Sequence, residues 1–276
     1  LAVTEGGTIS AATEGAGAAG NISVDVNRLN LASGSRVLSS TSADGAGGTV
    51  AVSAGELVSI SGAGSGLFST ASGTGNAGQI TVTAPALAAV PTLTMADGGT
   101  ISVATSGAGS AGSILLNANN LSLTGGAQVV SSTTGAGQGG SVTANAAQSI
   151  SISGGGPQAS GLFSTASSTG NAGEIAVSTP TLVMADGGRI SAATQGAGNA
   201  GSIVLNVNNV TQTAGSTIDS STSGAGQGGN ITLTAANSAS ISGTGTGLFS
   251  TASRSGAGGN IHIEAGQLVW LAGNPT

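Results

Sequence analysis

The stretch NISVDVNRLNLA, residues 21–32, decides the fold of this 276-residue chain. Its aliphatic residues alternate with polar ones, and this period of two predicts half-buried strands rather than a helix. The preceding stretch ISAAT, residues 9–13, has the same alternation, and glycine, serine and asparagine separate the stretches. We therefore expect three short strands, at 9–13, 21–26 and 28–33, joined by turns.

Several short sequence motifs recur along the whole chain. GGTIS at 6–10 recurs at 98–102 and, as GGRIS, at 187–191, whereas GLFSTAS begins at Gly66, Gly161 and Gly247. These motifs divide the chain into three super-repeats, at approximately 1–92, 93–181 and 182–276. Within them, one aliphatic residue follows each glycine-rich stretch at steps of 28 to 34 residues: Ile22, Val50, Ile80, Ile114, Val142, Ile175, Ile203, Ile231 and Ile261.

Three strands repeated in nine aligned coils of about 30 residues predict a right-handed parallel β-helix, that is, an all-β solenoid. At about 4.8 Å per coil, nine coils form a rod about 43 Å long.

We expect a single domain, cut from a longer chain. The third coil of each unit takes up length differences at 84–92 and 154–160, and Pro85, Pro91, Pro157 and Pro180 should lie outside the strand ladders. The glycines should supply turns with positive φ.

The composition excludes several classes of function. There are 51 glycines, no cysteine, 5% charged and 1% aromatic residues, and a net charge of −6 with only four arginines. Binding to nucleic acid or to an anionic membrane surface needs a basic stripe, which four scattered arginines do not form. No apolar run approaches the ~20 residues that cross a bilayer. No signal peptide is visible in the sequence.

Glycine motifs suggest cofactor chemistry at first sight. Residues 15–20, 107–112 and 196–201 match the dinucleotide fingerprint GxGxxG. Because that fingerprint must open a helix, and these copies precede strand-like residues, we interpret them as repeat turns and expect no cofactor. Asp44 and Glu14 are the acids near these turns, too few for a calcium β-roll, so no metal site is predicted.

Catalysis by a polysaccharide-cleaving β-helix would need neighbouring carboxylates on one face. Alignment of Ile22 with Ile261 gives the outward column Asp25, Ser53, Thr83, Asn117, Asn145, Ser178, Asn206, Thr234 and Glu264. Its two acids lie at opposite ends, and the single histidine, His262, stands beside Glu264. We therefore predict that the chain is not an enzyme.

The phenylalanines indicate an interaction surface instead. When Val37 is aligned with Leu67, the outward column reads Ser10, Leu38, Phe68, Ser102, Val130, Phe163, Ser191, Asp219 and Phe249. Its apolar members Leu38, Phe68, Val130, Phe163 and Phe249 form the predicted interaction stripe, for lateral association or for stacking on sugar rings. Two alternatives remain open: a one-residue slip would put phenylalanine in the core, or a variable loop would cover it.

Other polar residues are interpreted structurally. Glu5, Asp97 and Asp186 occupy equivalent turns as surface charges, and Arg36 and Arg189 align with Thr8. Four asparagines in Asn-x-Ser/Thr sequences are expected to serve turns or ladders: Asn21, Asn120, Asn209 and Asn230. The outward columns are too mixed for the flat threonine arrays that bind ice.

The phrases GGTISAAT, GAGAAGNI, LNLASGS and SSTSGAGQGGNI resemble the repeat regions of filamentous-haemagglutinin-like proteins of two-partner secretion systems, particularly the cyanobacterial ones. The resemblance covers the whole chain. It implies a right-handed β-helix, export through an outer-membrane partner, and a role in adhesion or surface structure. The NPNG-type secretion motif of that family is not visible in this sequence.

These observations predict a non-enzymatic structural or adhesive rod at the extracellular or outer cell surface of a bacterium. The expected partners are other copies of the chain, in end-to-end or lateral association, or cell-surface glycans. Two alternatives stay open: a carbohydrate-binding or carbohydrate-active β-helix, and a filament formed by head-to-tail stacking of the open coil ends.

Overall fold

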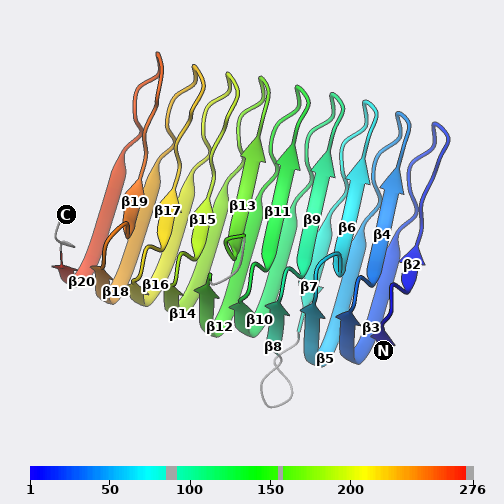
Figure 1. Cartoon of the computed structure of the whole chain (residues 1–276), viewed down its shortest axis with the longest axis horizontal. Coiled ribbons are helices and arrows are strands. Elements are labelled where there is room, and N and C mark those ends of the chain that lie inside the picture. Colours follow the sequence, from blue (N-terminus) through cyan, green and yellow to red (C-terminus); the bar gives the residue numbers. More distant parts are fainter. Residues whose placement is uncertain (85–91, 155–157, 272–276) are drawn as a thin grey trace.

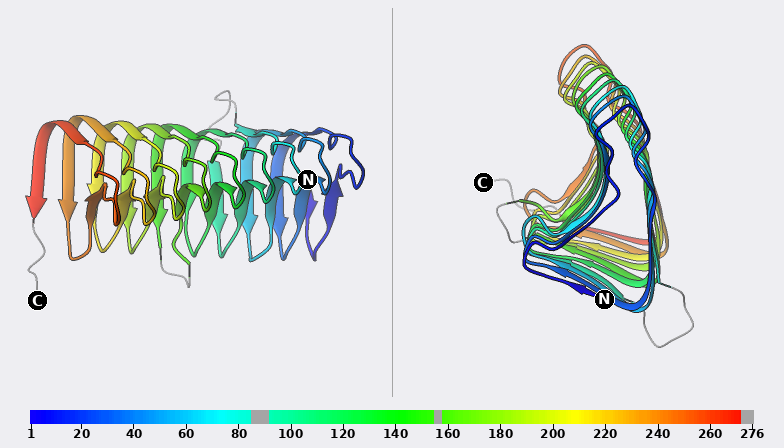
Figure 2. Two further views of the ribbon diagram at one scale, coloured as in Figure 1. Left: turned by 90° about the horizontal axis from the view of Figure 1, so that it is seen from above. Right: turned by 90° about the vertical axis from the view of Figure 1, so that its right-hand side faces the viewer.

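The chain winds through coils that stack along one axis, and each coil adds strands to two parallel sheets (Figure 1). The computed structural model describes residues 1–84, 92–154 and 158–271, and this part of the chain contains strands and no helix. About nine coils of about 29 residues are present. Seen from the N-terminal end, the chain runs clockwise as it recedes, so the solenoid is right-handed (Figure 2). The predicted fold is confirmed.

The larger sheet, sheet A, is built from the longer strands of the coils. Most of its strands have ten to twelve residues and pair in parallel with the next coil. Its members are β1 (Ala2–Val3), β3 (Ile22–Ala32), β5 (Val50–Ser61), β7 (Ile80–Thr83), β8 (Thr92–Ala96), β10 (Ile114–Leu123), β12 (Val142–Ser153), β14 (Ile175–Ala185), β16 (Ile203–Gln212), β18 (Ile231–Ser242) and β20 (Ile261–Leu271).

The smaller sheet, sheet B, closes the coil on another side and consists of strands of three to six residues. It contains β2 (Thr8–Ser10), β4 (Arg36–Thr41), β6 (Gly66–Ala71), β9 (Thr100–Thr105), β11 (Gln128–Thr133), β13 (Gly161–Ala166), β15 (Arg189–Ser191), β17 (Thr217–Asp219) and β19 (Gly247–Phe249).

The core is a set of aliphatic columns that run along the axis. The strand registers place the nine aliphatics predicted from the repeat, from Ile22 to Ile261, in one continuous column. Ile80, the third residue of this column, is fully buried, and burial of such a side chain stabilises the fold by roughly 1.5–3 kcal/mol. Each residue contacts its counterparts in the coils before and after, so stacking buries a face that one coil alone leaves open.

Sheet A bends sharply, and this bend replaces one of the predicted turns. The expected strands 21–26 and 28–33 are one strand, β3, whose pairing shifts register between Val26 and Arg28. Similar shifts interrupt β12, β16 and β18. The bend gives the coil three sides, as Figure 2 shows in end view. In the third coil the bend separates β7 from β8, at the variable segment 84–92.

Pro180 corrects one prediction. It lies within β14, not outside the strands, at the bend where neither neighbouring strand pairs with it. Thr179 pairs with Val207 and Thr181 with Asn209, so the missing N–H of Pro180 costs no ladder hydrogen bond. The other three prolines, 85, 91 and 157, fall outside the described residues.

In six of the described coils, the corner between sheets A and B is a tight turn in which two successive residues have positive φ. At Ser33–Gly34 the φ angles are 56° and 81°, and Ser35 N donates to Ala32 O at 3.3 Å. This is the pattern of a type I′ turn, which favours glycine, asparagine or aspartate. Asp97 and Asp186 hold the first position in two other coils, with φ of 51° and 50°. Ala214 holds it with φ of 49°.

The opposite corner is drawn out into a narrow ridge by the glycine-rich segments, whose loops rise side by side in Figures 1 and 2. Along this ridge, hydrogen bonds to the next coil recur every third residue: Ala19 N donates to Ala46 O at 2.9 Å, and Ile22 N donates to Thr49 O at 2.8 Å. A period of three is that of the polyproline II helix, and where such chains pack closely, as in collagen, every third position must be glycine.

Two glycine columns, three residues apart, form what we call the glycine spine. A Cβ atom on any of these glycines from the second coil onward would lie 1.6–2.3 Å from a backbone oxygen of the preceding coil. Positive φ therefore explains the glycines at the corner between the sheets, as predicted, but not those of the spine, where close approach between coils excludes side chains. The columns are Gly17, Gly45, Gly75, Gly109, Gly137, Gly170, Gly198, Gly226 and Gly256, and Gly20, Gly48, Gly78, Gly112, Gly140, Gly173, Gly201, Gly229 and Gly259.

Buried serines join sheet B to the spine. The hydroxyl of Ser69 donates to Gly48 O in the preceding coil at 2.8 Å and accepts from Gly78 N in its own coil at 3.0 Å. One side chain thereby satisfies two buried backbone groups, which would otherwise cost free energy. The same position is serine in two coils of every unit: Ser39, Ser69, Ser131, Ser164, Ser220 and Ser250.

Candidate interaction surface

The outer face of sheet B holds the column that contains the phenylalanines. Pairing runs without a slip through Ser10, Leu38, Phe68, Ser102, Val130, Phe163, Ser191, Asp219 and Phe249. Leu67 is fully buried, so Phe68 points outward, and the alternative register with phenylalanine in the core is wrong. Leu38, Phe68, Val130 and Phe163 are half-buried, and Phe249 is 40% exposed.

A glycine two residues before each phenylalanine shapes this surface. A Cβ atom on Gly161 would lie 3.0 Å from Cζ of Phe163, and the corresponding distances are 2.9 Å at Gly66 and 3.1 Å at Gly247. Each ring therefore folds back along its own strand and lies over the glycine. Any side chain at the glycine would collide with the end of the ring, which explains why the sequence GLF recurs. The repeat is visible in the sequence, but its cause is not.

One ring has a cationic neighbour. The guanidinium carbon of Arg36 lies 5.3 Å from the centroid of the Phe68 ring, within the range of a cation–π contact. Arg36 Nε also donates to Gly64 O at 3.2 Å, which holds the side chain along the sheet. The first unit thus presents an aromatic ring that is already covered on one side by arginine.

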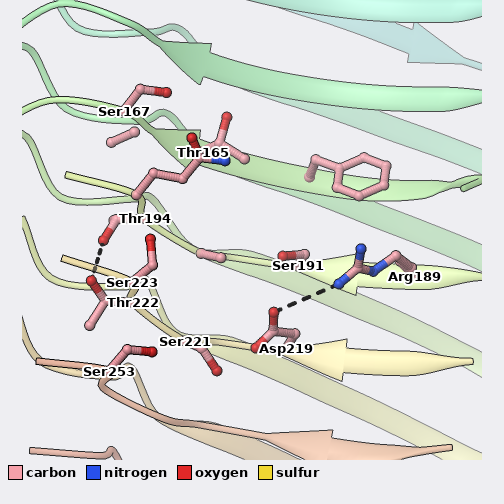
Figure 3. Close-up of a pocket in the computed structure, with 14 residues that line it drawn as sticks. Thr165, Ser167, Arg189, Ser191, Thr194, Asp219, Ser221, Thr222, Ser223 and Ser253 are labelled. Atoms are coloured by element: carbon pink, nitrogen blue, oxygen red, sulfur yellow. Dashed lines mark hydrogen bonds and ion pairs between the residues drawn. The ribbon is translucent and has the colours of Figure 1, made fainter. Parts of the chain in front are cut away.

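A groove opens on the same face in the third unit, over β15 (Figure 3). Its floor contains the small residues Ser191 and Ala193, and its volume is about 380 Å³. The neighbouring strands supply the walls, with Phe163 and Thr165 on the β13 side and Asp219 on the β17 side. The full lining comprises Phe163, Thr165, Ala166, Ser167, Arg189, Ser191, Ala193, Thr194, Gln195, Asp219, Ser221, Thr222, Ser223 and Ser253.

An ion pair stands at one end of this groove. Arg189 Nη2 lies 3.9 Å from Asp219 Oδ2, with 45% of the arginine side chain and 18% of the aspartate side chain exposed. Arg189 Nε donates to Thr217 Oγ1 at 3.2 Å. Asp219 Oδ1 is buried and has no hydrogen-bond partner. This pair was not predicted from the sequence, although Asp219 is the one charged residue in an otherwise apolar or serine column.

The carboxylates considered for catalysis are far apart. The registers place Asp25 and Glu264 at the two ends of one outward column on sheet A, eight coils or about 38 Å apart. His262 lies beside Glu264, and all three residues are exposed. In the described ranges, no group of three or more histidine, cysteine or acidic side chains could hold a metal ion.

The glycine motifs lead into strands. Gly20, Gly112 and Gly201 precede β3, β10 and β16, so the helix that a dinucleotide fingerprint opens is not formed at these positions. The four Asn-x-Ser/Thr asparagines each accept a hydrogen bond from the next coil, as predicted for ladder residues: Asn21, Asn120, Asn209 and Asn230.

No protein-family model matches this chain, and neither does any curated protein or solved structure. Within residues 1–84, 92–154 and 158–271, no helix is long and apolar enough to cross a membrane.

Proposed function

We propose that this chain is a non-enzymatic rod of a bacterial surface or secreted protein and that the outer face of sheet B is its contact surface. One observation supports this most strongly: all three phenylalanines of the chain lie in one outward column, where their rings recur at intervals of three coils, about 14 Å. Ordered apolar groups on an outer surface are typical of interaction sites.

The construction of the coils supports a structural role. Aliphatic columns, the glycine spine and the serine hydrogen bonds all link each coil to the next, so stability grows with the number of coils. Such a rod holds its surface groups at fixed spacing. The separation of Asp25 from Glu264 favours a role without catalysis, because general acid–base hydrolysis of a glycoside needs carboxylates close together.

The location and partners belong to the same proposal. By resemblance to filamentous-haemagglutinin-like proteins, the chain is exported through an outer-membrane partner and acts outside the cell. Its contact partners are other copies of the chain or cell-surface glycans. The absence of cysteine is compatible with this location because the fold needs no disulfide.

Antibody labelling of the bacterium that makes the chain tests this proposal. We expect an antibody raised against residues 1–276 to label intact cells or secreted material as strongly as permeabilised cells. Labelling that appears only after permeabilisation contradicts the proposal. Sedimentation of the purified chain across concentrations separates the partners: self-association that rises with concentration indicates other copies, and a constant monomer indicates glycans.

A further inference from the structure

The three units differ at two positions that face each other on the outer side of sheet B. In the first coil of a unit, Thr8 and Thr100 correspond to Arg189. In the second coil, Leu38 and Val130 correspond to Asp219. The third unit has thus replaced a threonine and an aliphatic residue by an arginine and an aspartate. The two changes are paired, since Arg189 reaches Asp219 across one coil.

This pair is poorly suited to stabilising the fold. At 3.9 Å the nitrogen–oxygen contact is longer than a hydrogen bond, and the arginine is nearly half exposed. Asp219 Oδ1 is buried without a partner, which costs free energy that a valine at this position would not. Exposed or imperfect ion pairs contribute little to stability. A pair that stability does not require, placed in a groove, indicates binding.

The groove offers two kinds of contact to one ligand. Phe163 lines one wall with an apolar ring, while Arg189 and Asp219 supply hydrogen-bond donors and an acceptor, and Ser191 leaves room between them. A pyranose ring needs this combination, because its C–H face is apolar and its hydroxyl groups donate and accept. The charges of arginine and aspartate cancel, and the chain as a whole has a net charge of −6, so an anionic sugar is disfavoured.

We propose that the groove over β15 binds a sugar ring of a neutral oligosaccharide, with Phe163 against the ring face and Arg189 and Asp219 on adjacent hydroxyl groups. This inference rests on the proposed function in one respect, that the outer face of sheet B is the contact surface. It adds the ligand class and assigns the binding to the third unit.

The chain itself provides the substitutions for the test. The double variant Arg189→Thr with Asp219→Val restores the residues that the second unit has at these positions, so it should fold normally. Arg28→Thr, which removes the arginine of an exposed ion pair with Glu56 on sheet A, is the control. The probes are the neutral hexasaccharides cellohexaose, maltohexaose, laminarihexaose and chitohexaose, with hexagalacturonate as the anionic comparison, titrated into the intact chain by calorimetry and by NMR.

We expect at least one neutral probe to bind and to shift the backbone amide signals of Ser191 and Ala193. The double variant should bind it at least tenfold more weakly, because two charge-assisted hydrogen bonds are lost, and Arg28→Thr should bind as the parent does. No binding of any neutral probe at millimolar concentration, equal binding by the double variant, or preference for hexagalacturonate would each overturn the inference. None of these results bears on the cellular location, which antibody labelling decides separately.

Discussion

Substitution of one glycine in the middle of the spine should destabilise the solenoid strongly. A Cβ atom on Gly137 would lie 2.0 Å from Gly109 O and 2.4 Å from Gly109 C in the coil before it. Both atoms belong to the backbone, so no flexible side chain can move aside. Gly17 occupies the same place in the first coil, where a Cβ atom meets only Thr13 Cγ2 at 3.8 Å. Gly137→Ala and Gly17→Ala are therefore a matched pair.

The expected loss in the free energy of unfolding can be worked out from the contacts that the added methyl group disrupts. Separating the two coils by more than an ångström weakens the hydrogen bonds between them, among them Ala111 N to Gln138 O at 2.8 Å and Ile114 N to Ser141 O at 2.9 Å. Each such bond contributes about 1 kcal/mol, and overpacking adds roughly 1–3 kcal/mol. We expect Gly137→Ala to cost about 3 kcal/mol in the free energy of unfolding. Gly17→Ala should be neutral or stabilise by up to about 1 kcal/mol through the unfolded chain.

Two assays measure this difference. Denaturant unfolding followed by circular dichroism gives the global change, and hydrogen exchange by mass spectrometry locates it, because repeat proteins open locally. Exchange should accelerate in residues 105–142 of the Gly137→Ala chain and remain unchanged there in the Gly17→Ala chain. Equal midpoints and equal exchange in the two variants would refute the close approach of the coils.

Three further substitutions test other parts of the fold by the same denaturation assay. Ser69→Ala should destabilise by roughly 1–3 kcal/mol, since Gly48 O and Gly78 N both lose a partner; no loss would contradict the serine link. Ala214→Gly should stabilise by about 0.5–1 kcal/mol, because it relieves a positive φ of 49°, and a loss of stability would show that the turn is assigned wrongly. Ile80→Ala should cost about 2–5 kcal/mol as a cavity in the core column, and a cost below about 1 kcal/mol would argue against stacking.

The stacking of the coils was predictable from the sequence because the side-chain alternation and the repeat length agree. Ile22, Val50 and their counterparts follow glycine-rich stretches at regular steps, and only a parallel solenoid aligns them. The same alignment placed Phe68 outward. The bend of β3 was not predictable, since a register shift within one strand leaves the alternation of NISVDV and RLNLAS almost unchanged.

The spine and the groove needed the structure. Glycine at Gly45 fits either a positive φ or a close neighbour, and only the position of Gly17 O above it decides between them. Arg189 and Asp219 are 30 residues apart in the sequence and meet because Arg189 pairs with Thr217, one coil on, and Asp219 follows two residues later on the same face. Comparison of equivalent positions between units would have found them, because both depart from the residues of the other two units.

The most direct test of the central claim compares adhesion by the chain with and without its phenylalanine rings. Phe68→Ser, Phe163→Ser and Phe249→Ser can be combined, since serine already occupies this column at Ser102 and Ser191 and should preserve the fold. Beads coated with either chain are scored for clumping and for attachment to bacterial cells and polysaccharide films. We expect the parent chain to adhere and the triple variant to lose most of this adhesion while its circular dichroism stays the same. Undiminished adhesion by the folded triple variant would contradict the claim that the outer face of sheet B is the contact surface.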